Sequence, residues 1–251
     1  MKVVLVGAAL ALFAWGPPAW SDLPDTIERV KPSIVGIGTV LPTRRPPGNF
    51  VATGFVVGDG RHVLTNAHAL PEDINDSRRE HLAVITIGSK VLKAEVVAKD
   101  MDHDIALLRF QGSALPHLRL DAGRTIREGE LYAFSGFPIG MVLGLYPVTH
   151  RGIIAAVTPV AIPQLSGRSL NSKMVRRLSA PYDVYQLDAT AYPGNSGSPL
   201  YDPETGAVVA VINKVFVKET KENVLEKPSG ITYAIPIRWG VALMKKAGVG
   251  D

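Results

Sequence analysis

Short apolar runs rich in valine, isoleucine and threonine recur along most of the chain, and glycine, proline, aspartate or asparagine separates most of them. Runs of this length and composition, bounded by turn-forming residues, predict β-strands. The pattern therefore indicates a protein built mainly from strands. The first group of expected strands covers 33–40, 52–58, 62–67, 81–88, 90–99 and 105–110, and the second covers 131–137, 146–157, 184–189, 198–201, 207–217 and 231–237.

The two groups are separated by a polar stretch, 111–130, and flanked by two helix candidates, 23–30 and 238–248. The second candidate has apolar positions at helical spacing and a basic pair near its C-terminal end, where it suits the helix dipole. Strand spacing alone favours sandwiches and barrels equally. We expect an all-β fold of two packed, six-stranded antiparallel barrels. Their expected bounds are about 33–115 and 128–237, followed by a helix over 237–248.

Two longer segments, 162–183 and 218–230, lack a strand or helix pattern. Irregular segments of this length inside compact domains are usually functional or disordered.

Residues 1–21 have the pattern of a secretory signal peptide, with cleavage expected before Asp22. A short basic start precedes an apolar run over 3–15, and a Gly-Pro-Pro break follows. An uncleaved membrane anchor is the alternative, but the run is short against the ~20 residues that span a bilayer. We therefore expect a periplasmic or secreted chain of residues 22–251 without stable membrane association.

Composition and charge exclude several classes of protein. The 251 residues include no cysteine, which excludes disulfides, a cysteine-based zinc site and a thiol nucleophile. The formal net charge is only +4, and the arginine pairs lie in different segments, so no nucleic-acid partner is expected. No motif indicates a metal, a nucleotide or another cofactor.

One stretch late in the chain, 194-GNSGS-198, raises the possibility of a nucleophilic serine. Taken alone it is equally an ordinary turn, because glycine, asparagine and serine dominate turns. A serine nucleophile needs a base, a group that orients the base, and donors for the oxyanion. His68, at the end of an expected strand, is the candidate base. Asp104, at the start of the expected strand 105–110, is the candidate orienting carboxylate, because a half-buried carboxylate needs a partner such as an imidazole N–H.

Other arrangements of the same residue types are weaker. Asp100, Asp102, His103 and Asp104 resemble a metal cluster by composition, but the sequence offers no second group of ligands to complete a site. The remaining histidines occupy unexceptional strand or loop positions, where we expect surface or packing roles. They are His62, His81, His117 and His150.

His68, Asp104 and Ser196 follow one another in the chain order of the chymotrypsin-like fold. The stretches 53-TGFVVGDGRHVLTNAHAL-70, DHDIALL and 188-DATAYPGNSGSPL-200 resemble the HtrA/Deg family of exported, ATP-independent serine proteases. The segments 135-SGFPIG-140 and 149-THRGIIAAV-157 are also similar to that family, so the resemblance covers about residues 27–237. It implies a serine endopeptidase acting on polypeptides.

In this interpretation Ser196 attacks the peptide carbonyl, His68 is the base and Asp104 orients the imidazole. Backbone N–H groups of the turn, Gly194, Asn195 and Ser196, form the expected oxyanion hole. Digestive relatives have an aspartate at the position of Asn195, which pairs with a freshly cut N-terminus. Activation by that ion pair is therefore not expected here.

Specificity and control follow less directly. Thr190 matches the floor of the primary substrate pocket and is neutral, which argues against a preference for arginine or lysine. Val215, Phe216 and 231–234 are the expected pocket walls, and their apolar character favours small or medium aliphatic side chains. The resemblance also implies a possible homotrimer, to which 23–30 would contribute.

The sequence departs from the family in four respects. The chain stops after the closing helix, so a PDZ module is not expected. Lys214 stands where the family more often has a small hydroxyl residue, so either its side chain points away or the alignment shifts by one residue. Ser198 and Tyr192 replace the usual glycine and asparagine.

Two hypotheses remain. The first is an exported serine endopeptidase, acting on unfolded or misfolded proteins. The alternative is a latent, protease-like binding module that needs a partner to form its oxyanion hole.

Overall fold

The structure is a computed structural model, and it describes residues 22–71, 74, 76–138, 145–160, 181–213 and 231–250. Strands are the main secondary structure of these residues, as the sequence pattern predicts. The strands of the first half are β1 (Ile34–Val40), β2 (Gly48–Val57), β3 (His62–Thr65), β4 (His81–Ile85), β5 (Val91–Asp100) and β6 (Ile105–Phe110). Those of the second half are β7 (Leu131–Gly136), β8 (Val148–Pro159), β9 (Asp183–Asp188), β10 (Pro199–Tyr201), β11 (Val208–Asn213) and β12 (Ile231–Pro236).

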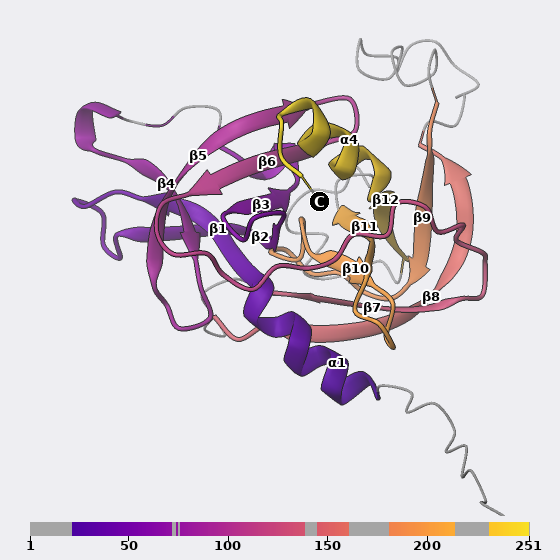
Figure 1. Ribbon diagram of the computed structural model, residues 1–251. Helices are drawn as coiled ribbons and strands as arrows, with labels where there is room; N and C mark the ends of the chain where they lie inside the picture. The colour runs from indigo at the N-terminus through magenta and orange to yellow at the C-terminus, as the bar shows by residue number, and fades with distance from the viewer. Residues whose placement is uncertain are drawn as a thin grey trace, which may run out of the picture.

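Each half closes into a six-stranded antiparallel barrel, so the predicted fold class is confirmed. The strand order is β1-β2-β3-β6-β5-β4 in the first barrel and β10-β11-β12-β9-β8-β7 in the second. Closure removes the free sheet edges that would otherwise pair with other chains. Figure 1 shows the two barrels side by side, with helix α4 (Arg238–Lys246) above the place where they meet.

Some strands begin or end at other residues than the sequence predicts, because strand pairing or a turn sets the boundary there. β2 begins at Gly48, before the expected residue 52, because it stays paired with β1 past a register shift between Ile37 and Gly38. β3 ends at Thr65, where the chain enters a short 3₁₀ turn, Ala67–Ala69. The expected strand 207–217 is described as far as Asn213.

Three groups of buried side chains form the core. One fills the first barrel and one fills the second. The third lies between the barrels and includes Phe55 and Leu107 from the first, Val211 and Ile235 from the second, and Leu243 from α4. This shared core fixes the position of one barrel against the other, because burying apolar surface there stabilises the packed arrangement.

The N-terminal helix α1 (Leu23–Val30) is also attached to the second barrel. Asp22 caps its first turn by accepting a hydrogen bond from the Leu23 N–H at 2.7 Å. Thr26, fully buried, donates its hydroxyl to the Glu204 carbonyl at 3.1 Å. None of the helices in the described part of the chain is long and apolar enough to cross a membrane.

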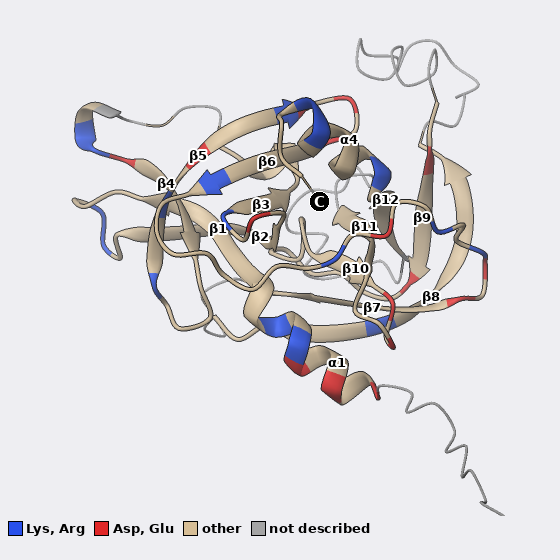
Figure 2. Cartoon of the chain, in the orientation of Figure 1, with Lys and Arg blue, Asp and Glu red and all other residues tan. Residues whose placement is uncertain are grey.

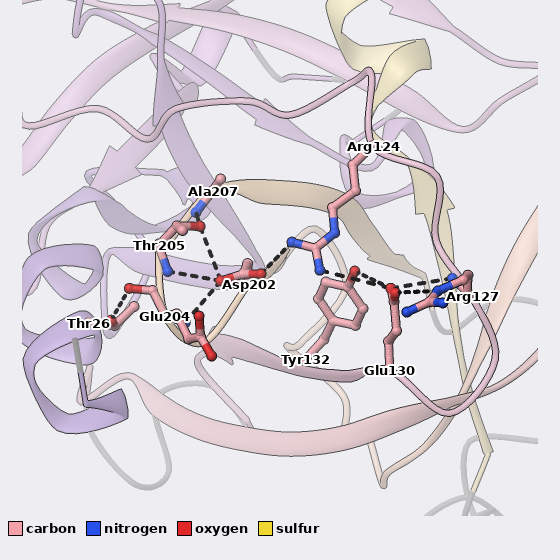
Figure 3. A network of polar contacts seen from close by, with 9 residues as sticks. All are labelled: Thr26, Arg124, Arg127, Glu130, Tyr132, Asp202, Glu204, Thr205 and Ala207. Carbon is pink, nitrogen blue, oxygen red and sulfur yellow. Dashed lines mark hydrogen bonds and ion pairs between the residues drawn. The ribbon is translucent and has the colours of Figure 1, made fainter. Parts of the chain in front are cut away.

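A polar network joins the segment between the barrels to the second barrel (Figure 3). Arg124, in that segment, forms an ion pair with Asp202 and stacks 5.5 Å from the centre of the Tyr132 ring. The Tyr132 hydroxyl donates to Glu130 at 2.9 Å, and Asp202 also caps the turn that contains Thr205. The network attaches the segment between the barrels to the second barrel. In the cartoon of Figure 2, basic and acidic positions are spread over helices, strands and loops of both barrels.

Candidate active site

His68 and Asp104 lie together at one end of the first barrel. β3 and β6 pair antiparallel, with Thr65 opposite Ala106, so the residues just after β3 meet those just before β6. The His68 Nδ1 lies 2.7 Å from Asp104 Oδ2, and the His68 backbone N–H donates to Oδ1 at 2.8 Å. Both carboxylate oxygens are therefore used to hold one histidine, as the sequence interpretation requires of an orienting group.

The backbone of Asp104 is held in an unusual conformation. Its φ is 55°, in the left-handed region, which aspartate tolerates better than most residues but at a cost in energy. The Asp104 carbonyl accepts hydrogen bonds from the Ala67 N–H at 3.2 Å and from the Asn66 side chain at 3.1 Å. These contacts fix the carboxylate toward His68.

The Asp104 carboxylate is ionised at neutral pH although it is only 3% exposed. Burial on its own raises the pKa of this carboxyl, but hydrogen bonds and charge from His68, together with a hydrogen bond from Asn213, lower its pKa below the ordinary value. A buried carboxylate with a lowered pKa is the state that stabilises a neighbouring imidazolium.

Asn213 is a site residue that the sequence interpretation missed. It ends β11 in the second barrel, is fully buried, and donates its Nδ2–H to Asp104 Oδ2 at 2.8 Å. The sequence pointed instead to the neighbouring position, Lys214, which lies outside the described residues. β11 is buried along its whole length, so its burial pattern does not identify Asn213; the signal available was the alternative of an alignment shifted by one residue from Lys214.

The turn that carries Ser196 is bonded to the first barrel through Thr53. The Thr53 N–H donates to the Ser196 carbonyl at 3.0 Å, and the Thr53 hydroxyl donates to the Gly194 carbonyl at 2.7 Å. Thr65, three residues before His68, donates its hydroxyl to the Thr53 carbonyl at 2.7 Å. Thr53 therefore links the serine turn directly to the strand that leads to His68.

Two glycines allow this turn to form. Gly194 and Gly197 have φ values of 98° and 85°, which residues with a Cβ rarely adopt. At Gly197 an added Cβ would lie 2.1 Å from the Thr53 carbonyl oxygen and 2.4 Å from the Thr65 hydroxyl. Only glycine permits such close contact between the serine turn and the first barrel.

One of the three expected oxyanion donors is already used within the turn. The Asn195 N–H already donates to the Tyr192 carbonyl at 3.0 Å, whereas neither the Gly194 nor the Ser196 N–H donates to another described residue. Among the described residues, no hydrogen bond joins the Ser196 hydroxyl to the His68 imidazole. Such bonds are often long in the absence of substrate and shorten in the complex.

The structure describes only part of the expected substrate pocket. Thr190 follows β9 and is half-buried. Val215 and Phe216 lie outside the described residues, and so do most of the two irregular segments.

The acidic residues before Asp104 do not converge on one point. Asp100 pairs with His103, whose Nδ1 lies 2.7 Å from its Oδ2, while Asp104 faces His68. Of the groups that resembled a metal cluster by composition, Asp100 and His103 form one carboxylate–imidazole pair, Asp104 belongs to another with His68, and Asp102 is in neither.

Two closed antiparallel barrels, with a histidine–aspartate pair on the first and a serine turn of the second bonded to the first through Thr53, are typical of the chymotrypsin-like class of proteins. The family model of the trypsin-like peptidase domain matches residues 52–211. The chain belongs to this family.

The similar proteins of known sequence are serine proteases of the DegP/HtrA type. A probable periplasmic DegP-like serine endoprotease of Pseudomonas savastanoi pv. phaseolicola is 30% identical over 210 residues, which cover 78% of this chain and 36% of that protein. The serine protease HTR4 of Bos taurus is 28% identical over 234 residues, covering 88% of this chain and 40% of that protein.

Among solved structures, the serine endoprotease from Yersinia pestis superimposes with a TM-score of 0.63 at 22% identity. The match covers 90% of this chain and 66% of that one, and it supports the fold. The chain spans about a third to a half of the length of the curated relatives that it matches, from 33% to 50%.

Proposed function

We propose that this chain is a serine endopeptidase in which Ser196, His68 and Asp104 form the catalytic triad. The observation that carries the proposal is the pair of contacts between the Asp104 carboxylate and His68: Oδ2 lies 2.7 Å from the imidazole Nδ1, and Oδ1 accepts from the backbone N–H at 2.8 Å. The Asp100–His103 pair has the same two bonds, but only the Asp104–His68 pair follows a strand that is linked to the Ser196 turn, through Thr65 and Thr53. The side chain of His68 is 28% exposed and accessible to a substrate.

The chemistry follows from these positions. His68 takes the proton of the Ser196 hydroxyl as the oxygen attacks the peptide carbonyl, and then returns a proton to the leaving amine. Asp104, accepting from Nδ1–H, selects the tautomer whose Nε2 is free to act as base. Asn213 keeps Asp104 ionised and correctly turned, so the imidazolium formed during attack lies beside a full negative charge.

The Gly194 and Ser196 N–H groups are the proposed donors to the oxyanion. The Asn195 carbonyl lies in the same peptide plane as the Ser196 N–H and accepts a hydrogen bond from the Ser198 N–H at 3.0 Å, which fixes the direction of that donor, while the Thr53 bonds to the Gly194 and Ser196 carbonyls hold the turn against the first barrel. Donors fixed before the reaction stabilise the developing charge at no cost of reorganisation, and one such donor is worth about 10²–10³ in turnover.

The proposed substrates are polypeptides, including unfolded ones, in the periplasm or outside the cell. The names of the periplasmic DegP-like relatives support the compartment and the reaction. The neutral Thr190 at the proposed pocket floor favours small or medium aliphatic side chains over arginine and lysine. A homotrimer, with α1 taking part, is the proposed assembly.

The test compares the full chain with its Ser196→Ala variant on unfolded casein and with a serine-directed phosphonate probe. The matched control is Ser113→Ala, the same change at an exposed loop position. Cleavage and labelling by the wild type and the control, and neither by Ser196→Ala, is the expected result.

Absence of both cleavage and labelling in the wild type would contradict the endopeptidase proposal and favour the latent binding module. Labelling that persists in Ser196→Ala would show that another serine is the nucleophile. Cleavage of an arginine- or lysine-directed peptide library would contradict the proposed pocket alone.

A further inference from the structure

A second carboxylate–imidazole pair lies directly before Asp104 in the chain. His103 Nδ1 is 2.7 Å from Asp100 Oδ2, and the His103 backbone N–H donates to Asp100 Oδ1 at 3.0 Å. The face of the same imidazole ring makes an aromatic contact. The His103 imidazole stacks on the indole of Trp239 in α4, with ring centres 3.6 Å apart and planes at 17°.

The cluster also reaches the second barrel. Tyr182, just before β9, has its ring centre 4.6 Å from that of His103 and 5.7 Å from that of Trp239. Its hydroxyl lies 3.4 Å from the Asp102 carbonyl. The guanidinium of Arg238 lies 5.3 Å from the centre of the Trp239 ring, on α4. His103 is therefore held by groups from β5, α4 and the start of β9.

The residue that follows His103 is one of three described non-glycine residues with a left-handed backbone, together with Arg79 and Ser89. Asp104 has a φ of 55°, and a left-handed conformation outside glycine persists only where the surroundings enforce it. On its C-terminal side Asp104 is followed by β6, whose hydrogen bonds fix the chain. On its N-terminal side, the His103 side chain holds the backbone in place through its contacts with Asp100 and Trp239.

We infer that His103 is a positioning residue of the active site, and this inference rests on the proposed endopeptidase function. Its imidazole bridges Asp100 on the first barrel and Trp239 on α4, and so holds Asp104 in the conformation that aims the carboxylate at His68. His103 does not touch the reacting atoms. It acts through the backbone of the next residue.

Packing alone does not account for an imidazole at this position. The His103 side chain is 20% exposed and that of Asp100 is 27% exposed, so the pair lies at the surface rather than in the core. An aliphatic side chain would cover Trp239 equally well. Only a ring with an N–H donor can stack on the indole and at the same time bond the carboxylate.

Three substitutions separate these two contacts. His103→Ala removes both contacts. His103→Asn keeps a donor close to the position of Nδ1 and loses the stack, whereas His103→Phe keeps the stack and loses the donor. The matched control is His117→Ala, at an exposed position with no interaction to His103 among the described contacts.

The measurement is kcat and KM on a fluorogenic peptide that the wild type cleaves, with the rate of phosphonate labelling and the melting temperature of each variant. We expect His103→Ala to lower kcat and labelling by about 10-fold with KM unchanged, because small misplacements of catalytic groups are costly. His103→Asn and His103→Phe should each recover part of the loss.

A second readout does not depend on activity. The hydrogen-bonded Nδ1 proton of His68 gives a low-field NMR resonance, assigned by its loss in Asp104→Asn. We expect it to broaden or disappear by exchange in His103→Ala, to be partly restored in His103→Asn, and to persist in the control.

The outcomes separate the two proposals. A wild type that neither cleaves nor labels contradicts the endopeptidase function and removes the basis of this inference. An active wild type whose His103 variants keep the same kcat and the same His68 resonance overturns the inference alone. If His103→Ala does not fold, His103→Asn and His103→Phe test the inference by the same two measurements, kcat and the His68 resonance.

Discussion

The hydrogen bond from Asn213 to Asp104 can be tested by removing one side-chain amide. Asn213→Ala leaves the backbone of β11 intact and deletes the 2.8 Å bond to Oδ2. Because both residues are buried, at 0% and 3% exposure, water does not readily replace the lost donor. The carboxylate then keeps His68 as its side-chain donor and loses one of the contacts that lower its pKa.

The size of the effect follows from the charge of the acceptor. A hydrogen bond to a charged group contributes about 1.5–3 kcal/mol, and in a domain of this size each kcal/mol lowers Tm by about 2–4 °C. The expected loss in Tm is therefore about 3–12 °C. The loss in kcat/KM is about 10-fold, since each ~1.4 kcal/mol of lost transition-state stabilisation is a factor of ten.

The pH dependence gives a second, independent prediction. A carboxyl whose pKa is lowered in the folded state contributes stability that is present above its unfolded pKa and is lost as the pH falls through its folded pKa. Without Asn213 the pKa of Asp104 rises toward its ordinary value. The free energy of unfolding of Asn213→Ala should therefore decrease less between neutral and acidic pH than that of the wild type.

The assay is urea unfolding from neutral to acidic pH together with peptide-cleavage kinetics. Asn49→Ala is the matched control, the same truncation at an exposed position in β2. If Asn213→Ala keeps the kcat/KM, the melting temperature and the acid profile of the wild type, Asn213 of the second barrel does not position the Asp104 carboxylate of the first barrel.

Two further predictions concern the serine turn and a half-buried histidine. Gly197→Ala should abolish casein cleavage and cost at least about 1–3 kcal/mol in stability, because its φ is 85° and the added Cβ meets the Thr53 carbonyl oxygen; Gly123→Ala, in open space, is the control. Burial lowers the pKa of His150, which stacks on Phe134, below its usual 6.5, so its contribution to stability is complete above about pH 6.5 and is lost as the pH falls. His150→Phe should therefore flatten the stability curve between about pH 7 and pH 5, and an unchanged slope would contradict this assignment.

The strands and the histidine–aspartate pair were predictable from local patterns, whereas two barrels rather than sandwiches followed from the grouping of the strands and from the resemblance. β-branched runs bounded by turn residues mark strands wherever they occur, and His68 and Asp104 lie at strand ends that antiparallel pairing brings together. The start of β2 was not predictable, because Gly48 and Asn49 have turn-like chemistry and are strand residues only through pairing with β1.

Asn213 and Thr53 were missed for a different reason. Each contributes to the site by crossing from one barrel to the other, and contacts of that kind depend on how the shared core aligns the barrels. No periodicity within a single strand encodes this alignment. Even a correct resemblance pointed to position 214, one residue from the side chain that meets Asp104.

The Thr53 and Asn213 contacts have a consequence for the chain while it folds. The proposed nucleophile is on the second barrel and the base on the first; Thr53 of the first barrel holds the serine turn, and Asn213 of the second barrel holds the Asp104 carboxylate that orients the base. A chain with only one barrel formed therefore carries no assembled site, whichever half folds first. If the proposed triad is the catalytic site, a chain with one barrel formed has no activity toward its neighbours, and local unfolding of either barrel abolishes cleavage.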